Sequence, residues 1–243
     1  MTDARPPQTP GVKIQYLIRR RTTTSRDELI AHWFANHMPS VIARNEANRT
    51  TQAPAASHYV ASLFQAEDTA QGWDGVAQLW YDAPLPYPTQ ASGVVPADTF
   101  HEKVEPYWPW NTHEWVVLDG ALPLEVPTLN APFPCTRSGF LKQISLVAAK
   151  PGVDVGAMFD HWLDVHIPNV RETMRKVGGF RYVVSLSTDL DRAPYAGMAE
   201  LYFPDLHAQA AFWDAIESDG FEAWADASAT VRVRCDTEMV GIE

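Results

Sequence analysis

The chain has 243 residues, 46% of them apolar and 11% aromatic, which is enough to bury one large core or two smaller ones. Its 19 basic and 30 acidic residues give a net charge of −11, so we expect no binding to nucleic acid or to anionic membranes. No stretch approaches 18 apolar residues, no apolar signal segment follows Met1, and the only cysteines are Cys135 and Cys235. We therefore expect a cytoplasmic protein that crosses no membrane and has neither a disulfide framework nor a cysteine zinc site.

The first half of the chain predicts the element order βαββαβ. Residues 13–20 are apolar and β-branched, as in a strand, and residues 25–45 form an amphipathic helix that begins with a capping box of Ser25 and Glu28. The remaining predicted elements are strands at 57–64 and 75–81, a helix at 97–107 and a closing strand at 114–118. The proline-rich loop at 83–96 is either a lid over a site or a rigid surface loop.

The second half predicts the same order and aligns with the first. Its predicted elements are strands at 140–148, 180–187, 197–203 and 231–240, and helices at 154–176, ended by Gly178 and Gly179, and at 206–227. Residues 13–39 align without a gap on residues 142–168, and the segments 32–39 and 161–168 share His, Trp, His and Pro at matching positions. These matches indicate an internal duplication.

The duplication predicts how the chain is organised. We expect one ferredoxin-like repeat at residues 12–118, a proline-rich linker at 119–138 and a second repeat at 139–242. A four-stranded sheet with both helices on one face leaves its other face apolar, so it needs a second sheet to cover it. We therefore predict an α+β fold in which two βαββαβ repeats form an intrachain pseudo-dimeric α/β barrel, and a homodimer of the whole chain is compatible with this prediction.

Three motifs in each half carry a resemblance to a known family. A helix with Trp-x3-His-x-Pro is followed by a strand with His-Tyr-Val or Arg-Tyr-Val, and then by Gly-Val-Ala-Gln-Leu-Trp in the first half and Gly-Met-Ala-Glu-Leu-Tyr in the second. Both halves resemble EthD-domain proteins of the dimeric α/β-barrel superfamily. The resemblance implies the fold more strongly than the activity, because such relatives include cofactor-free dehydratases of polyketide pathways, monooxygenases, isomerases and proteins of no assigned role.

Two histidines are the main candidates for catalysis. His37 and His166 lie on the predicted sheet-facing stripes of their helices, one turn after Trp33 and Trp162. A partly buried imidazole can act as a general base near neutral pH, although a structural core histidine would show the same pattern. His32 and His161, five residues earlier, are predicted on another face of an ideal α-helix, which disfavours a metal site built from either pair, and we expect no bound metal.

The neighbouring strands supply the other candidates. Tyr59 and Tyr182 occupy matching positions and could supply a proton, or could be core aromatics, while His58 and Arg181 lie on the opposite strand face as candidate substrate contacts. Asp74 either orients a histidine or closes the turn before Gly75, and the second half has Ala196 in its place. Glu200, where the first half has Gln78, needs a partner in its apolar strand, either a substrate or a salt bridge to Arg181.

Aromatic residues complete the candidate site. Trp33 and Trp162 are predicted to contact substrate, and Trp110 belongs to an aromatic cluster at 107–115 that suits either an aromatic-binding pocket or an interface between the repeats. The sequence lacks the glycine-rich, P-loop, Gly-x-Ser-x-Gly and Cys-x-x-Cys motifs of nucleotide, acyl-serine and thiol-redox chemistry.

We expect an enzyme that needs no cofactor. The leading hypothesis is a lyase, specifically a dehydratase, or an isomerase that acts on a small aromatic or polyketide-like carbonyl compound, with His37 or His166 moving the proton and Tyr59 and Asp74 assisting. One alternative is an oxygenase or haem-using enzyme, which sister families with this barrel include. Another is a protein that binds a small molecule without catalysis. The substrate and the working repeat are not specified by the sequence.

Overall fold

The computed structural model describes residues 5–68, 72–122 and 133–243, and they form two compact units. The first-repeat unit contains Pro10–Asn111, residues 133–138 and Asp236–Glu243, and the second-repeat unit contains residues 5–9, 112–122 and Gly139–Cys235. Each unit therefore draws on both halves of the chain. Most of the predicted linker lies outside the described residues.

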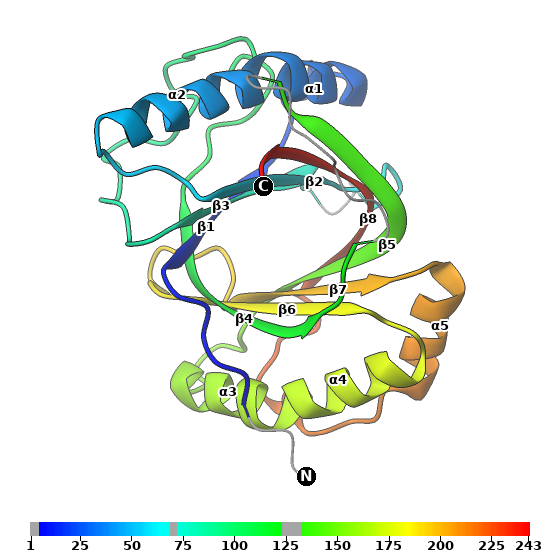
Figure 1. Cartoon of the computed structure of the whole chain (residues 1–243). Coiled ribbons are helices and arrows are strands. Elements are labelled where there is room, and N and C mark those ends of the chain that lie inside the picture. Colours follow the sequence, from blue (N-terminus) through cyan, green and yellow to red (C-terminus); the bar gives the residue numbers. More distant parts are fainter. Residues whose placement is uncertain (1–4, 69–71, 123–132) are drawn as a thin grey trace. The chain divides into compact units, whose positions relative to one another are not determined.

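The first-repeat unit begins with a strand, a long helix and two further strands. Its elements are β1 (Val12–Ile18), α1 (Arg26–His32), η1 (Trp33–His37), α2 (Met38–Thr50), β2 (His58–Leu63) and β3 (Gly75–Tyr81). The predicted capping box is confirmed, since the Glu28 N–H donates to Ser25 Oγ at 3.2 Å and the Glu28 carboxylate accepts from the Ser25 N–H at 2.9 Å. The continuous helix formed by α1, η1 and α2 covers one face of β1, β2 and β3 (Figure 1).

The predicted helix at 97–107 is wrong, because this segment is a chain of turns. Its apolar spacing resembles that of a helix, but Pro96 and Pro106 flank it and isolated backbone bridges tie Val104 to Arg20 and Tyr107 to Ser92. Phe100 and Val104 are fully buried in the first-repeat core, together with Trp33. Burial of these side chains, rather than a helical period, accounts for the apolar pattern.

The second-repeat unit has the same order with an additional helix. The remaining elements along the chain are β4 (Trp110–Asp119), β5 (Cys135–Val147), α3 (Val155–His161), η3 (Trp162–His166), α4 (Ile167–Lys176), β6 (Arg181–Ser187), β7 (Gly197–Phe203), α5 (Leu206–Ala215), η4 (Phe221–Ala223) and β8 (Val231–Ile242). The second-repeat unit includes β4 from Thr112, β5 from Gly139 and β8 up to Cys235. Strand β5 starts inside the predicted linker. The helix predicted at 206–227 ends at Ala215 and gives way to the short 3-10 turn η4, which follows Gly220 at a positive φ of 89°.

The strand pairings assign the closing strands to the units. In the first-repeat unit the order is β1–β3–β2–β8, with the end of β8, residues 237–242, antiparallel to β2. In the second-repeat unit the order is β5–β7–β6–β4, with residues 112–119 of β4 antiparallel to β6. The closing strand of each sequence repeat thus completes the sheet of the other unit. The predicted α+β class is confirmed, as is the β-helix-β-β order in each unit.

No helix in the described part of the chain has both the length and the apolar character that a membrane span requires.

Candidate functional site

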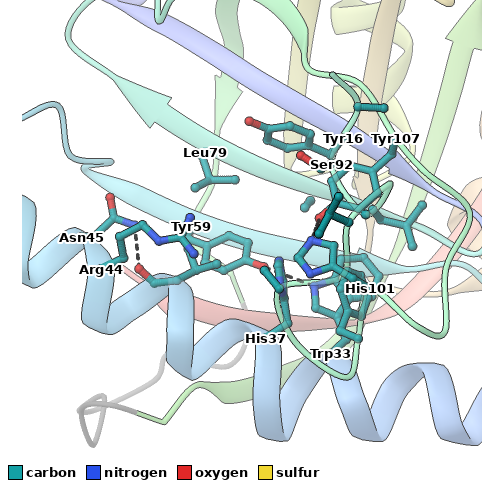
Figure 2. Close-up of a pocket in the computed structure, with 18 of the residues that line it drawn as sticks. Tyr16, Trp33, His37, Arg44, Asn45, Tyr59, Leu79, Ser92, His101 and Tyr107 are labelled. Carbon is teal, nitrogen blue, oxygen red and sulfur yellow. Dashed lines mark hydrogen bonds between the residues drawn. The ribbon is translucent and has the colours of Figure 1, made fainter. Parts of the chain in front are cut away.

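Each unit contains one cavity built around the predicted histidine. The first-repeat cavity has a volume of about 420 Å³. Helix residues, strand residues and the turns after β3 line it; those used below are Tyr16, Trp33, His37, Arg44, Tyr59, Phe100, His101 and Tyr107. Figure 2 shows His37, His101 and Trp33 side by side at one end of this cavity, with Tyr59 pointing toward them.

A π-helical turn places His37 at the cavity. The residues Trp33–His37 form this turn, in which the Met38 N–H donates to the Trp33 carbonyl five residues earlier. Pro39 follows and has no N–H to give to an α-helical bond, which favours the wider turn. The segment Trp162–His166, followed by Pro168, repeats this arrangement. The shared Trp-x3-His-x-Pro motif therefore encodes a local widening of the helix at the histidine.

Asp98 orients His37. His37 Nδ1 lies 2.7 Å from Asp98 Oδ2, and the backbone N–H of His101 donates to Asp98 Oδ1 at 3.0 Å. Partial burial would raise the pKa of Asp98, but these two hydrogen bonds outweigh burial and lower the pKa to about 2. The ionised carboxylate favours the tautomer with a proton on His37 Nδ1, which leaves Nε2 as the acceptor nitrogen. The ring of Phe100 stacks on His37 at 4.4 Å between centroids.

His101 is a second histidine at the same carboxylate, and the sequence hypothesis missed it. Its Nδ1 lies 2.7 Å from Asp98 Oδ1 but is not oriented for a hydrogen bond, and its Nε2 lies 3.1 Å from the Tyr107 hydroxyl. Burial lowers its pKa, which favours the neutral ring. His37, Asp98 and His101 have ligand atoms within 4.8 Å of one another, so within the described residues this group has the chemistry to hold a metal ion. The short His37–Asp98 contact is equally that of a carboxylate-oriented base.

Trp33 from the helix turn and Tyr59 from β2 form another part of the cavity wall. Trp33 Nε1 donates to the Tyr59 hydroxyl at 3.2 Å, and both side chains are almost fully buried. Burial raises the pKa of Tyr59 well above 10, so its hydroxyl keeps its proton at neutral pH. Tyr59 can therefore donate a hydrogen bond to a ligand in this cavity, which is one of the roles predicted for it.

The second-repeat cavity reproduces this arrangement in a volume of about 300 Å³. His166 Nδ1 lies 2.8 Å from Asp219 Oδ2, which also accepts from Asn169 Nδ2 at 2.8 Å, and Phe221 stacks on His166 at 4.3 Å. His161 Nε2 lies 3.9 Å from Asp219 Oδ1, so His161 and His166 converge on one carboxylate. The prediction that they lie on separate faces is wrong here because it assumed an ideal α-helix rather than a π turn.

The aspartates could have been found in the sequence. Asp98 and Phe100 form the pattern Asp-x-Phe at 98–100, and Asp219 and Phe221 repeat it at 219–221. This further match between the halves falls in segments predicted as helices, at 97–107 and 206–227, where no sequence pattern indicated a site. The two patterns differ at the next position, where the first repeat has His101 and the second has Glu222.

Five predicted site residues line neither cavity: His58, Asp74, Trp110, Arg181 and Glu200. Asp74 is buried and accepts the Arg20 backbone N–H at 2.8 Å, with an ion pair to the Arg20 guanidinium at 3.2 Å. His58 packs edge-on against Trp80 on the surface side of β2, and Trp110 is buried within the first-repeat unit.

The suggested Glu200–Arg181 salt bridge is wrong. Glu200 pairs with Lys142 Nζ at 2.7 Å, with both side chains buried, whereas Arg181 pairs with the exposed Asp119 at 2.6 Å. Strand β5 lies next to β7 and presents Lys142 on the same face as Glu200, a pairing that requires the strand register. Of the predicted residues, Trp33, His37 and Tyr59 meet in the first cavity, and Trp162, His166 and Tyr182 meet in the second.

The fold and these sites define an α+β protein with ferredoxin-like units, each with a histidine and an aspartate in its cavity. Residues 150–228 match the model of the family described as EthD domain, and the inferred resemblance is confirmed for this segment. No curated protein resembles the sequence closely enough to count as a match.

A solved structure with a TM-score above 0.5 agrees with the fold. An anthrone oxidase-like protein matches with a TM-score of 0.57 and 10% identity, covering 97% of this chain and 95% of its own. A chlorite dismutase variant from Candidatus Nitrospira defluvii has a TM-score of 0.46 and 9% identity, covering 93% of this chain and 91% of that chain. A haem-binding protein from Thermus thermophilus has a TM-score of 0.42 and 11% identity, covering 97% and 92%. At these identities the likeness concerns the fold alone.

Proposed function

We propose that this chain is a cofactor-independent lyase, acting as a dehydratase on a small aromatic or polyketide-like carbonyl compound in the first-repeat cavity. The observation that carries the proposal is the His37–Asp98 pair, with its 2.7 Å contact, at the wall of an aromatic-lined cavity of about 420 Å³. Such a pair is a general base whose protonated form is stabilised by the adjacent carboxylate.

The reaction needs only groups that line this cavity. His37 Nε2 takes a proton from the carbon next to the substrate carbonyl, and the electron pair moves toward the carbonyl oxygen. The Tyr59 hydroxyl, protonated and next to Trp33, donates a hydrogen bond to that oxygen. When the carbon–oxygen bond to the β-hydroxyl breaks, the leaving hydroxide takes the proton from His37 and departs as water, which leaves a carbon–carbon double bond.

The substrate class follows from the lining. Tyr16, Phe100 and Tyr107 present aromatic surfaces, and Arg44 adds one cationic group for a polar substituent. The anthrone oxidase-like neighbour carries the name of an aromatic ketone, which supports this class. We expect this small-molecule substrate to be what the chain binds, and we expect the protein to act in the cytoplasm.

Two assays test the proposal. Proton abstraction is measured as exchange of the hydrogens next to the carbonyl of 1-tetralone in D₂O, and dehydration as formation of fluorescent 1-naphthol from 3-hydroxy-1-tetralone. Replacing His37 by alanine should lower both rates by roughly 10² to 10⁴ while the circular dichroism spectrum stays unchanged.

His166→Ala is the matched control and should leave the activity of the first cavity intact. Loss of activity only in the His166 variant would move the reaction to the other repeat, and full activity in both variants would refute histidine catalysis. Metal analysis and treatment with a chelator distinguish a free base from a metal ion at His37, Asp98 and His101. Oxygen consumption or a Soret band would instead favour the oxygenase or haem alternative.

A further inference from the structure

The second-repeat cavity contains two buried hydrogen-bond donors that the protein leaves without partners. Trp162 Nε1 and the Tyr182 hydroxyl both belong to side chains that line this cavity, and neither atom has a hydrogen-bond partner among the described residues. Trp162 is 1% exposed and Tyr182 is 0% exposed. A buried donor without an acceptor is costly, so unpaired donors in native proteins usually have a purpose.

The first repeat shows that this sequence can satisfy the same two groups. There, the equivalent Trp33 Nε1 donates to the Tyr59 hydroxyl at 3.2 Å. In the second repeat the indole still lies close enough to lower the pKa of Tyr182, although burial has the larger effect and the net pKa is raised. The two donors are therefore neighbours, but their contact falls short of the hydrogen-bond geometry that Trp33 and Tyr59 reach, and Tyr182 keeps its proton at neutral pH.

The surroundings favour an uncharged ligand with one oxygen acceptor. Phe212 and Phe221 give the cavity aromatic walls, and His166 is held by Asp219 at 2.8 Å beside them. The cationic groups of Lys150 and Arg232 are already engaged, by the Glu222 carbonyl at 2.6 Å and by the Trp213 ring at 5.5 Å. Two neutral donors next to each other match the two lone pairs of a carbonyl oxygen better than they match a cation or an aliphatic chain.

We propose that the second-repeat cavity is a separate binding site for a small aromatic ketone, whose carbonyl oxygen accepts hydrogen bonds from Trp162 Nε1 and the Tyr182 hydroxyl. The site stands independently of catalysis in the first repeat, because its donors and its cavity belong to the other unit. Its cavity of about 300 Å³ holds a bicyclic ketone with room to spare.

Stability without ligand gives the first test. Tyr182→Phe removes an unpaired donor and should raise the thermal midpoint by about 2 °C or more. The matched variant Tyr59→Phe removes the acceptor of the Trp33 N–H and should lower the midpoint by a similar amount. If Tyr182→Phe lowers the midpoint as Tyr59→Phe does, the Tyr182 hydroxyl is satisfied within the protein and the proposal is overturned.

Ligand binding gives the second test, with 1-tetralone labelled with ¹³C at the carbonyl as the probe. Wild-type protein should show a bound carbonyl resonance shifted downfield by hydrogen bonding, and Tyr182→Phe should weaken this binding about 3- to 10-fold and reduce the shift. Tyr59→Phe should change only the resonance of ketone bound in the first cavity, where Tyr59 contacts the carbonyl under the proposed function, and should leave the Tyr182-dependent resonance in place. Tetralin, which has the same rings without the oxygen, should bind less tightly to wild type and equally well to Tyr182→Phe. A set of bound tetralone resonances that Tyr182→Phe leaves unchanged, or equal affinity for tetralone and tetralin in the Tyr59→Phe protein, would refute a carbonyl site in the second repeat, whatever the first cavity binds.

Discussion

Asp219 shows how one side chain organises a cavity. Its carboxylate accepts hydrogen bonds from His166, from Asn169 and from the Phe221 backbone N–H, and His161 lies beyond the other oxygen. Burial would raise its pKa, but the hydrogen bonds outweigh burial and hold the pKa below its ordinary value of 3.8. A carboxylate with a lowered pKa stabilises the fold above its ordinary pKa, and this contribution is lost as the pH falls through the lowered value.

Replacement of Asp219 by asparagine should therefore destabilise the protein in a pH-dependent way. At pH 7 we expect a loss of about 1–3 kcal/mol in the free energy of unfolding, because hydrogen bonds to a charged acceptor are lost. The difference from wild type should shrink as the pH falls from about 4 toward the lowered pKa, because the carboxyl group takes up its proton first in the unfolded chain. Urea denaturation at several pH values measures this. Glu172→Gln, at an exposed helix ion pair, is the control and should change little at any pH.

Residue identities and spacing were enough to locate three of the four key side chains in each cavity. The Trp-x3-His-x-Pro motif and the tyrosine of the next strand identify Trp33, His37 and Tyr59, because helix and strand periods show which residues share a face. Helical and strand periods could not identify the partner aspartates, because these residues lie in irregular turns, where no period relates a residue's position in the sequence to the direction of its side chain. Only a comparison of the repeats for Asp-x-Phe could have revealed them.

At the scale of elements, a buried ion pair joins two neighbouring strands. Lys142 on β5 and Glu200 on β7 lie 2.7 Å apart with side chains 0% and 3% exposed, and Lys142 also faces the Tyr202 ring at 4.9 Å. In the first repeat the matching positions carry Lys13 and Gln78, and Gln78 bonds to Gln15 at 3.1 Å instead. Lys13 faces the Trp80 ring at 4.9 Å, so both sheets place a buried lysine against an aromatic ring. They differ in having Glu200 or Gln78 at the matching position.

Glu200→Gln should cost about 3–5 kcal/mol in the free energy of unfolding, because it leaves the Lys142 charge buried without its counterion. The double variant Lys142→Met with Glu200→Leu should recover much of that loss, since apolar residues of similar size can replace a buried pair. Chemical denaturation of the three proteins measures both effects. A double variant as unstable as Glu200→Gln would show that the pair contributes packing that apolar side chains cannot supply.

The strands and the first helices were predictable because their apolar periods are long and regular. The register that brings Lys142 to Glu200 was not, since a pairing of β5 with β7 involves residues more than fifty positions apart. The π turn was also hidden, because an ideal helical period was applied across Pro39 and Pro168. The local apolar pattern was enough to predict the helices and strands, whereas the pairing of distant strands decides which charged side chains form ion pairs.

At the scale of the whole molecule, each compact unit depends on a strand supplied by the other half of the chain. Residues 237–242 pair with β2 of the first-repeat unit, and Met239 and Ile242 are buried in its core with Trp33 and Tyr59. The repeats at 12–118 and 139–242 are a prediction from sequence matches, whereas the contacts assign each closing strand to the opposite unit. Each compact unit is built from separate stretches of the chain, so its boundary could not be predicted by dividing the sequence into consecutive segments.

Removal of residues 236–243 should therefore damage the first repeat more than the second. It exposes the edge of β2 and deletes Met239 and Ile242 from the first-repeat core, each worth about 2–5 kcal/mol by analogy with large-to-small core replacements. The core of the second repeat, which includes Trp162 and Tyr182, contains no residue from the deleted segment. Amide hydrogen exchange should show lost protection in β1, β2 and β3 and retained protection in β6 and β7. Tetralone should still bind in a Tyr182-dependent manner, although the His37-dependent exchange of the tetralone hydrogens is lost. Uniform loss of protection in both sheets would mean instead that the two units unfold as one cooperative structure, and that the exchanged strands couple their stabilities.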